Sequence, residues 1–567
     1  MLTLSPLQGA LLSDEMTKPH IILAVSINCC RFTDEIKNRR NMAKLNGRRL
    51  PVGIQSFQKI RKEGYQYVDK TDIIWNMVNN GDQFVYLSRP RRFGKSVLVD
   101  TLQMYLEGRK ELFEGLKIMD MEEHWTQHPV IRLDMSRGGA SADEIKSYLD
   151  YAFASYEKQY GIKPKPTDTL NVRLDMIIKA AHKASGQQVA ILIDEYDSPL
   201  QHSWKTPEHE GCTAIYRSVF AILKADDEFE KFVFITGITK FTQISLFSSL
   251  NNLTNISFFP EYAALCGITD QEIVDYFQPE LERMGKQNGW DIQETHNRLK
   301  EYYDGYHFCE ENMVDIYNPY SFINALAQSK LKTFWASSGA TSLLPKFVSD
   351  LELRLKDFDN CAILGTTIES SDVTGGGPEL FLYQSGYLTI KGYVNGIYLL
   401  GIPNHEVRQT LYEMVLPALA MRQSSDLQST QAFLKLYLNS GNLPEAMKCL
   451  KALIADVPYS NKKLASMDME ERYRLIISTI LNAIGLRVEV ERMLSTGRID
   501  IVAETQATIY VIELKLSKNG GRKAGIEQII NNQYLEPFKS SKRQVIGLAI
   551  ELDDMGKGLV DWGFAPV

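Results

Sequence analysis

The stretch from Gln83 to Met104 places the tightest constraint on how this chain folds. It contains an apolar run, then a basic turn ending in Gly94-Lys-Ser96, and then a helical pattern. This order of strand, tight loop and helix brings the amides of Gly94, Lys95 and Ser96 to the positive end of a helix, where an anion binds. A lysine in this position reaches the terminal phosphates of a nucleotide, and a serine hydroxyl there holds Mg²⁺. The stretch therefore predicts a phosphate-binding loop in an α/β domain.

The basic turn departs from the usual phosphate loop at its first position. The usual loop has a glycine six residues before its lysine, but this chain has Arg89 there, and the following Pro90 has no amide to donate. A basic turn in front of an ordinary helix is the alternative interpretation. Arg91 and Arg92 continue the basic run, and either one could contact a γ-phosphate or simply form a basic rim.

A second apolar run, Gln188–Glu195, ends in two acids. Acids at the carboxyl end of a buried parallel strand lie where an α/β sheet binds its ligands. We expect Asp194 to hold Mg²⁺ through water and Glu195 to polarise the attacking water. A strand that simply runs into a loop is the alternative. The position of this run downstream of a Gly-Lys-Ser loop favours an ATPase.

Further strands are predicted at Val130–Met135 and Phe232–Gly237, with helical stretches between them. This alternation predicts a parallel sheet covered on both faces. The strand from Phe232 should lie beside the phosphate strand, which makes Thr236 and Thr239 candidates for contact with a γ-phosphate. Threonine is also common at strand ends because it packs well there.

The composition favours a soluble protein of several domains. The chain has 567 residues, of which 44% are hydrophobic and 23% charged, and its net charge of -7 would not attract nucleic acid except through a local basic patch. Seven cysteines without a Cys-x-x-Cys pair argue against a disulfide framework or a zinc site and favour the cytoplasm. The apolar run Ile21–Ile27 is too short to span a membrane, and the nearby acids Asp14 and Glu15 do not suit a signal peptide.

Changes in pattern along the chain suggest domain boundaries. Residues 1–45 match nothing downstream and are expected to be a poorly ordered, dispensable extension or the result of an early choice of start codon, since Met42 stands just before the regular pattern. Residues 46–266 form the predicted P-loop domain and 267–330 a helical lid. A hairpin predicted at Gly386–Lys391 and Gly396–Gly401 makes 331–425 a winged-helix-like module, which could bind DNA or pack on the nucleotide core. Residues 426–567 form a last α/β domain.

Two smaller groups of residues have simpler explanations. His124 and His128 are four apart, as in some metal sites, but Pro129 follows at once and no third ligand is evident. A solvated helix end is therefore favoured over a metal site. The aromatic stretch Tyr302–Phe308 is expected to pack in a core rather than to stack on bases.

The last domain carries a second group of candidate functional residues. A helical pattern is followed by three predicted strands: Met469–Ile480, then Leu486–Val490, Arg498–Val502 and Ile509–Lys515. Side chains alternate along a strand, so Glu513 and Lys515 face the same side, and Asp500 joins them if the two strands pair. Two carboxylates with a backbone carbonyl suit Mg²⁺, and the lysine could orient a water or stabilise charge on a cleaved phosphodiester. An exposed strand with a charge pair is the alternative, but the apolar neighbours of Glu513 favour burial, and buried acids cost energy unless they have a role.

Asp500 and Glu513-Leu-Lys515 resemble the PD-(D/E)XK nuclease superfamily, with Gly497-Arg-Ile-Asp500 in the place of its first acidic motif. The resemblance implies a fold like that of restriction endonucleases, with Mg²⁺ or Mn²⁺ as the metal. It also implies roles on the flanking helices: Glu470, or Glu471 in its place, as an additional acid, and Gln528 with Tyr534 as the superfamily's Gln and Tyr pair.

From about Leu50 the whole chain resembles a bacterial family that joins an AAA-ATPase-like domain to such a nuclease domain. The resemblance rests on four stretches: Leu50-Pro-Val-Gly-Ile-Gln-Ser-Phe57, Ser88-Arg-Pro-Arg-Arg-Phe-Gly-Lys-Ser96, Asp194-Glu-Tyr-Asp197 and Tyr302-Tyr-Asp-Gly-Tyr306. It implies that an arginine in place of the first loop glycine is usual in this family. It also implies that some members of the nuclease superfamily have lost activity.

The sequence therefore predicts a cytoplasmic protein with two sites, one for ATP with Mg²⁺ and one for metal-dependent cleavage of nucleic acid, with DNA favoured over RNA. Nucleotide state is expected to control access of nucleic acid to the second site. No membrane partner is expected, and an oligomer is possible. The alternative is an ATP-switched module that binds nucleic acid or protein through an inactive nuclease fold.

Overall fold

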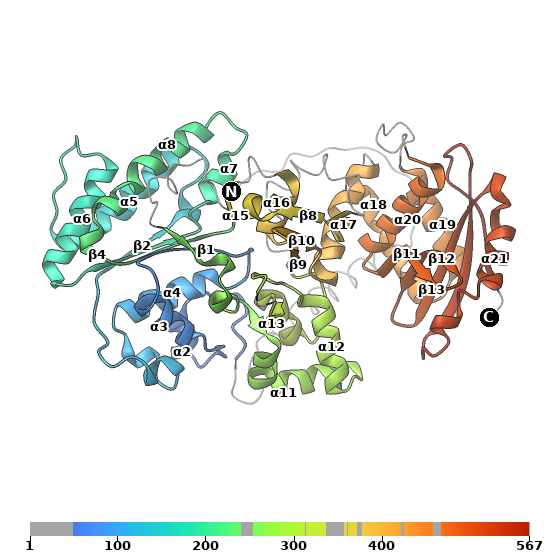
Figure 1. Cartoon of the computed structure of the whole chain (residues 1–567), viewed down its shortest axis with the longest axis horizontal. Coiled ribbons are helices and arrows are strands. Elements are labelled where there is room, and N and C mark those ends of the chain that lie inside the picture. The colour runs from blue at the N-terminus through green and yellow to red at the C-terminus, as the bar shows by residue number, and fades with distance from the viewer. Residues whose placement is uncertain are drawn as a thin grey trace, which may run out of the picture.

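The computed structural model of the protein describes residues 49–239, 253–311, 313–335, 357–359, 361–370, 377–420, 424–457 and 467–565. The extension predicted for residues 1–45 lies outside these ranges. Figure 1 shows an elongated molecule, with an α/β domain at the N-terminal end, a second sheet domain at the C-terminal end, and smaller helical and sheet elements between them. None of the described helices is both long and apolar enough to cross a membrane.

Five strands form the N-terminal sheet, in the order β2-β3-β4-β1-β5, and every pairing is parallel. The strands are β1 (Phe84–Ser88), β2 (Val130–Asp134), β3 (Val189–Asp194), β4 (Glu230–Gly237) and β5 (Thr254–Asn255). All six residues of β3 are buried, as a central parallel strand requires. The predicted strand from Phe232 lies directly beside the phosphate strand β1, with Thr236 opposite Leu87.

Helices cover both faces of this sheet, with α5, α6 and α8 on one face and α2, α3 and α4 on the other (Figure 1). The helices of this domain are α2 (Phe57–Lys62), α3 (Thr71–Asn79), α4 (Lys95–Leu106), α5 (Ala142–Tyr160), α6 (Leu170–Ser185), α7 (Ser198–Ser203), α8 (His209–Phe220) and α9 (Ile222–Ala225). Local sequence sets their ends. In α5, Ser141 and Glu144 form a capping box, and Gly161 ends the helix with φ 69°.

The predicted helical lid consists of three helices and a short two-stranded sheet. Its elements are β6 (Ile268–Thr269), α11 (Asp270–Asn288), α12 (Ile292–Tyr303), β7 (Ile316–Tyr317) and α13 (Pro319–Gln328). Thr269 and Glu272 form a second capping box at the start of α11. The lid has its own apolar core, which includes Phe277, Leu299 and Phe322.

The next module contains the predicted hairpin, as β9 (Thr389–Val394) and β10 (Ile397–Gly401). A third strand, β8 (Cys361–Leu364), pairs with the other side of β10, giving the order β8-β10-β9. Three helices accompany this antiparallel sheet: α15 (Gly365–Ser370), α16 (Gly377–Ser385) and α17 (His405–Ala420). The predicted hairpin is thus present as part of a three-stranded sheet, and the winged-helix-like character of this module stays a prediction.

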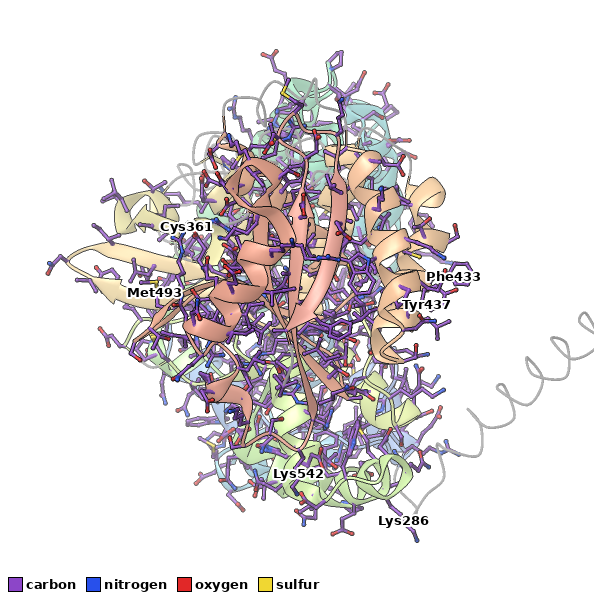
Figure 2. The ribbon with its side chains drawn as sticks, turned by 90° about the vertical axis from the view of Figure 1, so that its right-hand side faces the viewer. Lys286, Cys361, Phe433, Tyr437, Met493 and Lys542 are labelled. Atoms are coloured by element: carbon purple, nitrogen blue, oxygen red, sulfur yellow. The ribbon has the colours of Figure 1, made fainter. Side chains whose placement is uncertain are left out.

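The C-terminal domain is built on a five-stranded mixed sheet, in the order β11-β12-β13-β14-β15. Its elements are α18 (Ser424–Asn439), α19 (Leu443–Ala455), α20 (Met469–Ala483), β11 (Arg487–Leu494), β12 (Gly497–Glu504), β13 (Thr508–Leu516), α21 (Gly521–Asn531), β14 (Gln544–Leu552) and β15 (Leu559–Ala565). Figure 2 shows this end of the molecule, with Met493 of the β11–β12 hairpin on the opposite side from Phe433 and Tyr437 of α18. The helix predicted at Met469–Ile480 is α20, and residues 472–483 are all buried because other elements surround it.

One apolar cluster links three parts of the molecule. It runs from the N-terminal sheet through the β8–β10 module and α17 into helices α18–α20 and one face of the C-terminal sheet. The opposite face of that sheet has a separate cluster under α21. The two predicted sites therefore lie in domains that share a continuous apolar core.

Candidate functional site

The basic loop between β1 and α4 opens onto a cavity that Gly94, Lys95 and Ser96 line. Gly94 has φ 91°, a left-handed conformation that glycine adopts without strain, and it begins the 12-residue helix α4. The first amides of α4 have no partner within the helix and carry its positive end. The Lys95 ammonium donates to the carbonyl oxygens of Arg89 and Pro90, at 2.9 and 3.1 Å. The loop thus closes around its own lysine.

Arg89, in place of the usual first glycine, is buried and supports the loop. Its guanidinium donates to the carbonyl oxygens of Ser88 and Ser257, each at 2.9 Å, and of Tyr262 at 3.0 Å. It also lies over the ring of Phe308, 4.2 Å from the ring centre. Burial lowers the pKa of Arg89. The departure from the usual loop therefore has a structural reason, which the sequence could not reveal because three of the four partners, Ser257, Tyr262 and Phe308, are distant in the chain.

The structure brings Asp194, at the end of β3, to the first residues of α4. Its carboxylate accepts a hydrogen bond from the Ser96 hydroxyl, and a second from the amide of Glu195 at 3.0 Å. Burial raises the pKa of Asp194, while the Ser96 hydroxyl and the charge of Lys95 act in the opposite direction. Glu195 lines the cavity and has φ 47°, a conformation that is strained for a residue other than glycine.

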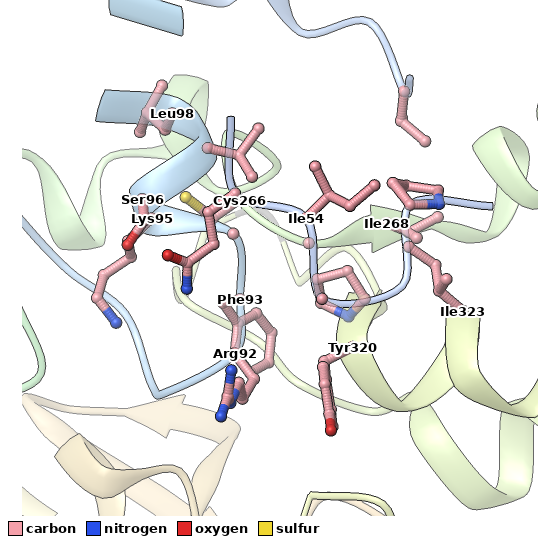
Figure 3. A pocket seen from close by; sticks show the side chains of 18 of the residues that line it. Ile54, Arg92, Phe93, Lys95, Ser96, Leu98, Cys266, Ile268, Tyr320 and Ile323 are labelled. Carbon is pink, nitrogen blue, oxygen red and sulfur yellow. The ribbon is translucent and has the colours of Figure 1, made fainter. Parts of the chain in front are cut away.

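The cavity extends from the loop to an apolar wall and has a volume of about 530 Å³, which is typical of a cofactor site. Figure 3 shows Ile54, Ile268, Tyr320 and Ile323 on the side away from Lys95. These residues come from the segment before α2, from β6 and from α13. The phosphate loop thus gives the cavity a cationic side, and these residues add an apolar wall, which Arg92 meets at Tyr320. Local sequence patterns missed this wall because it is assembled from separate segments.

Arg91 and Arg92 both line the cavity. The guanidinium of Arg91 lies 3.5 Å from the side-chain oxygen of Gln201. Arg92 has φ 69°, and its guanidinium lies over the ring of Tyr320, 4.9 Å from the ring centre. Figure 3 shows Arg92 and Tyr320 at the same edge of the cavity. Both arginines are thus at the cavity, and they are held by different partners.

Thr236 and Thr239 are buried, and their hydroxyls are used inside the domain. The Thr236 hydroxyl donates to the carbonyl oxygen of Leu87 in the neighbouring strand, at 2.8 Å. The Thr239 hydroxyl donates to Oδ2 of Asp197 at 2.6 Å. Both hydroxyls thus have hydrogen-bond partners inside the domain, and contact of these threonines with a γ-phosphate stays a prediction.

Asp197, which sequence reasoning did not select as a site residue, fixes the end of β4. Its Oδ2 accepts hydrogen bonds from the amides of Ile238 and Thr239, at 3.0 and 2.6 Å, and from the side chain of Gln201, at 2.6 Å. A Cβ atom on Gly237 would lie 2.3 Å from Oδ1 of Asp197, so this close approach requires glycine. The acidic segment after β3 and the end of β4 are therefore held as one unit next to the cavity.

In the C-terminal domain, the antiparallel pairing of β12 and β13 brings together the residues that the sequence singled out. Asp500 and Glu513 are both buried. Oδ2 of Asp500 accepts from the amide of Leu514 at 2.9 Å, and Oε1 of Glu513 accepts from the Lys515 ammonium at 2.9 Å. Burial is the largest single effect on Lys515 and lowers its pKa, but the hydrogen bond to Glu513 and the charges of Glu513, Glu470 and Asp500 together outweigh it and raise the pKa.

The residues of this site fit a divalent cation. Burial and the negative charge of Asp500 raise the pKa of Glu513 to about 7, although Lys515 acts in the opposite direction. Oε2 of Glu513 is buried and has no hydrogen-bond partner among the residues that the structure describes. An open carboxylate oxygen beside a second carboxylate is the donor type that Mg²⁺ and Mn²⁺ prefer. Among the described residues no group of three or more His, Cys, Asp or Glu side chains is arranged for a metal, so this site offers two carboxylates.

Arg474 on α20 also reaches this site, and sequence reasoning did not identify it. Its Nε donates to Oδ1 of Asp500 at 3.1 Å, and its Nη1 donates to Oε1 of Glu491 at 2.6 Å. The side chains of Arg474 and Asp500 are only 7% and 6% exposed. Glu491 has φ 56° and also pairs with Arg498, at 3.0 Å. No local pattern marks Arg474, because an arginine on a helix is ordinary until the helix is docked on the sheet.

The other residues predicted for this site lie at its margins. The charge of Glu470, on the first turn of α20, acts on both Glu513 and Lys515, and Glu471 is the next residue of that helix. The Gln528 side chain donates to the Tyr534 hydroxyl at 3.1 Å, and that hydroxyl donates to the carbonyl oxygen of Arg498 at 2.9 Å. This pair ties the end of α21 to the start of β12.

The histidines considered as metal ligands are used separately. Nδ1 of His128 lies 2.8 Å from the carbonyl oxygen of Gln188, and burial lowers the pKa of His128. His124 is exposed, and its amide donates to Oε1 of Glu122 at 3.0 Å. The segment around them is irregular rather than helical, so the expected helix end is absent from this described part of the chain.

Comparison with known proteins defines the class of both domains. Residues 51–247 match the family described as "Predicted AAA-ATPase", and residues 468–562 match the PD-(D/E)XK nuclease superfamily. The chain thus joins an AAA-ATPase-like domain to a PD-(D/E)XK nuclease superfamily domain, which confirms the resemblance seen in the sequence. It is also 28% identical over 537 residues to a protein of Azotobacter chroococcum mcd 1 described as "Uncharacterized protein in vnfD 5'region". The aligned part covers 91% of this chain and 98% of that protein.

Proposed function

We propose that this protein binds and hydrolyses ATP in the N-terminal cavity and cleaves nucleic acid, preferably DNA, at the C-terminal site. The observation that carries the second half is the buried, unpartnered Oε2 of Glu513 beside Asp500 and Lys515. A buried carboxylate oxygen without a partner is costly, and a metal ion would offset that cost. The described free cysteines fit a reducing compartment such as the cytoplasm: Cys212, Cys266, Cys309, Cys361 and Cys449.

In the N-terminal cavity, the phosphates of ATP would bind at the start of α4 and the base against the apolar wall. The Lys95 ammonium would exchange its two carbonyl partners for phosphate oxygens, which are stronger partners because they are charged. Ser96 and Asp194 would hold Mg²⁺, which supplies charge neutralisation for the leaving phosphate. Glu195, which lines the cavity and has φ 47°, would orient the attacking water.

At the C-terminal site, Asp500 and Glu513 would hold Mg²⁺ or Mn²⁺, which supplies an activated water and charge stabilisation. Lys515 lies 2.9 Å from Oε1 of Glu513 and would hold a phosphate oxygen or orient water. The Gln528–Tyr534 pair would keep β12, and with it Asp500, in register with α21.

Contacts of the phosphate loop support control of the nuclease-like site by nucleotide. Phe93, within the loop, packs edge-on against Tyr306 and Phe308, with ring centres 4.8 and 5.4 Å apart. The Tyr306 hydroxyl in turn donates to the carbonyl oxygen of Gly386, in front of β9, at 3.0 Å. A change in the loop on binding phosphate would therefore act directly on the aromatic stretch Tyr302–Phe308 and on the β8–β10 module.

The same aromatic stretch continues to the C-terminal domain. The ring of Tyr302 lies against the ring of His405, the first residue of α17, with ring centres 4.6 Å apart. His405 forms a hydrogen bond with the backbone of Gly485, just before β11. Helix α17 also packs along α20, which carries Glu470 and Arg474. We infer that this path joins the two sites, and nucleotide-dependent cleavage rates would test it.

A protein that binds nucleic acid or a partner through an inactive nuclease fold is a second candidate function. The observation that favours it is the ion pair of Arg474 with Asp500, which occupies one oxygen of a proposed metal ligand.

Cleavage of plasmid, linear and single-stranded DNA with Mg²⁺ or Mn²⁺ separates the two candidates. We expect the parent protein to cleave and Asp500→Asn to lose cleavage with near-normal ATP hydrolysis, because the change removes a metal ligand but keeps the side-chain shape. Glu504→Gln is the matched control, since Glu504 lies on the same strand and pairs with Arg543 away from the site. Absence of cleavage by the parent protein with every substrate and metal would favour the binding module.

A further inference from the structure

We propose that Arg474 is a positioning residue that competes with the divalent cation for Asp500 and thereby sets the metal affinity of the C-terminal site. This inference rests on the proposed nuclease function, because it takes Asp500 and Glu513 as the metal ligands.

Three of the four carboxylate oxygens of Asp500 and Glu513 already have hydrogen-bond partners. Oδ1 of Asp500 accepts from Arg474 at 3.1 Å, and Oδ2 accepts from the amide of Leu514 at 2.9 Å. Oε1 of Glu513 accepts from Lys515, while Oε2 of Glu513 has no partner. A metal bound to Oε2 of Glu513 would therefore share Asp500 with Arg474, or take its place.

Arg474 also places a positive charge next to the proposed metal position. A guanidinium does not lose its proton under ordinary conditions, so Arg474 is a permanent cation next to the proposed metal position. Its side chain is 7% exposed, and like charges repel more strongly there than in water. Replacing Arg474 by a neutral side chain would remove this repulsion. It would also leave the carboxylates of Asp500 and Glu491 short of positive charge, which a divalent cation would supply.

The position of Arg474 in the fold supports the same role. Arg474 lies in the second turn of α20, a helix packed between α17 and the sheet that carries Asp500. A small shift of α20 against β12 would lengthen the contact of Arg474 with Asp500 and open the site to the metal. Arg474 thus offers a point at which the path from the nucleotide cavity could act on the second site.

The test is titration of Mn²⁺ into the full-length protein by calorimetry, with metal-dependent melting temperature as a second readout. We expect Arg474→Met to bind Mn²⁺ about tenfold more tightly than the parent, since a buried like charge is removed. Arg474→Lys keeps the charge and should stay within about threefold of the parent. The matched control is Arg543→Met, which removes a cation paired with Glu504 elsewhere in the same domain and should bind Mn²⁺ as the parent does.

The melting temperature separates competition from simple stability. Arg474→Met should melt lower than the parent without metal and gain more from Mn²⁺. If Arg474→Met does not fold, the same prediction applies to Arg474→Gln, because the glutamine amide can still donate a hydrogen bond but has no charge. Equal or weaker Mn²⁺ binding by the neutral variant overturns the role of Arg474 and leaves the proposed nuclease function standing. No Mn²⁺ binding by any of the proteins overturns both.

Discussion

Lys95 and Glu513, one in each site, are held by short contacts and can still bind a ligand. Lys95 is held by two loop carbonyls, which are weaker partners than phosphate oxygens. Glu513 is held by Lys515 through one oxygen, and its other oxygen has no partner. At the residue scale, these are the groups whose replacement should have the clearest effect on binding.

Lys95→Ala should weaken ATP binding at least about tenfold. The substitution removes the point charge at the phosphates and the two hydrogen bonds that close the loop. A charged hydrogen bond contributes roughly 1.5–3 kcal/mol, so affinity should fall by about 10- to 100-fold or more. Calorimetric titration with ATP checks this, with Lys183→Ala, an exposed lysine at the end of α6, as the control. ATP binding by Lys95→Ala at parental affinity would show that the loop is not a phosphate site.

Glu230 should make stability depend on pH. Burial raises the pKa of its carboxyl to about 9 from the usual 4.5, and the charges of Asp226 and Asp227 add to the shift. Within the described part of the chain neither of its oxygens has a hydrogen-bond partner. Between these values the folded protein holds a proton that the unfolded chain releases, so stability falls as pH rises, by up to about 1.4 kcal/mol per pH unit. The variant Glu230→Gln stays neutral and should lack this loss. Melting temperatures from pH 5 to 9 should diverge with rising pH, and parallel curves would contradict the assignment.

The sequence marks residues whose chemistry is written in a local pattern. Asp194 ends an apolar run, Lys95 closes the basic turn after one, and Asp500 lies within an apolar strand pattern, so their approximate positions could be predicted. Arg474 and Asp197 could not, because each becomes distinctive only through hydrogen bonds to residues distant in the chain or on another element. The place of Thr236 on β4 was predictable, but the hydrogen bond from its hydroxyl to Leu87 was not, because that partner lies on another strand.

At the scale of elements, the aromatic stretch Tyr302–Phe308 and helix α17 connect the modules. Tyr306 and Phe308 pack in the apolar cluster that links the domains, whereas Tyr303 packs in the core of the lid. The stretch therefore contacts the phosphate loop on one side and α17 on the other. Its aromatic side chains pack in cores, as expected from the sequence, but those cores belong to different modules.

His405→Ala should weaken communication between the two sites without disabling either. The substitution removes the ring that lies between Tyr302 and the backbone of Gly485. Burial lowers the pKa of His405 to about 4, so the lost contact is that of a neutral ring. Such contacts are worth about 0.5–1.5 kcal/mol, so the ratio of cleavage rates with and without ATP should move toward one by roughly two- to tenfold.

Two measurements check this prediction. ATP hydrolysis alone and cleavage without nucleotide should stay near parental values in His405→Ala. The control is His182→Ala. His182 lies on α6, its ring packs against that of Phe229, and both residues are far along the chain from this path. A parental rate ratio in His405→Ala would remove α17 from the account.

Elements were more predictable than their assembly. The apolar runs that end at Asp194 and Lys515 predicted β3 and β13, and a hairpin pattern predicted β9 and β10. These patterns could be recognised because each lies within one short stretch of sequence. The wall formed by Ile54, Ile268 and Tyr320 was not, because no local pattern tells which segments meet across a cavity. The burial of α20 on all sides was missed for the same reason, since its outer face is covered by helices from another part of the chain.

At the scale of the whole molecule, the AAA-ATPase-like domain and the nuclease superfamily domain share one apolar cluster. Packed cores change between discrete arrangements rather than deforming freely, so a change at the phosphate loop can reach α20 through α17. An exposed ion pair between Glu301 of α12 and Arg487 of β11, at 3.5 Å, adds a second contact between lid and C-terminal domain. A pair this exposed contributes little stability, so we assign the connection chiefly to α17.

The most direct test of the central claim is the rate of DNA cleavage by the full-length protein in three states: without nucleotide, with ADP, and with ATP trapped by Glu195→Gln. Glu195→Gln should bind ATP but hydrolyse it slowly, because it loses the carboxylate that orients water. We predict that the trapped state cleaves several-fold faster or slower than the nucleotide-free state, as a coupling of roughly 1–3 kcal/mol would give. Equal cleavage rates in all three states would contradict the account and leave two independent sites on one chain.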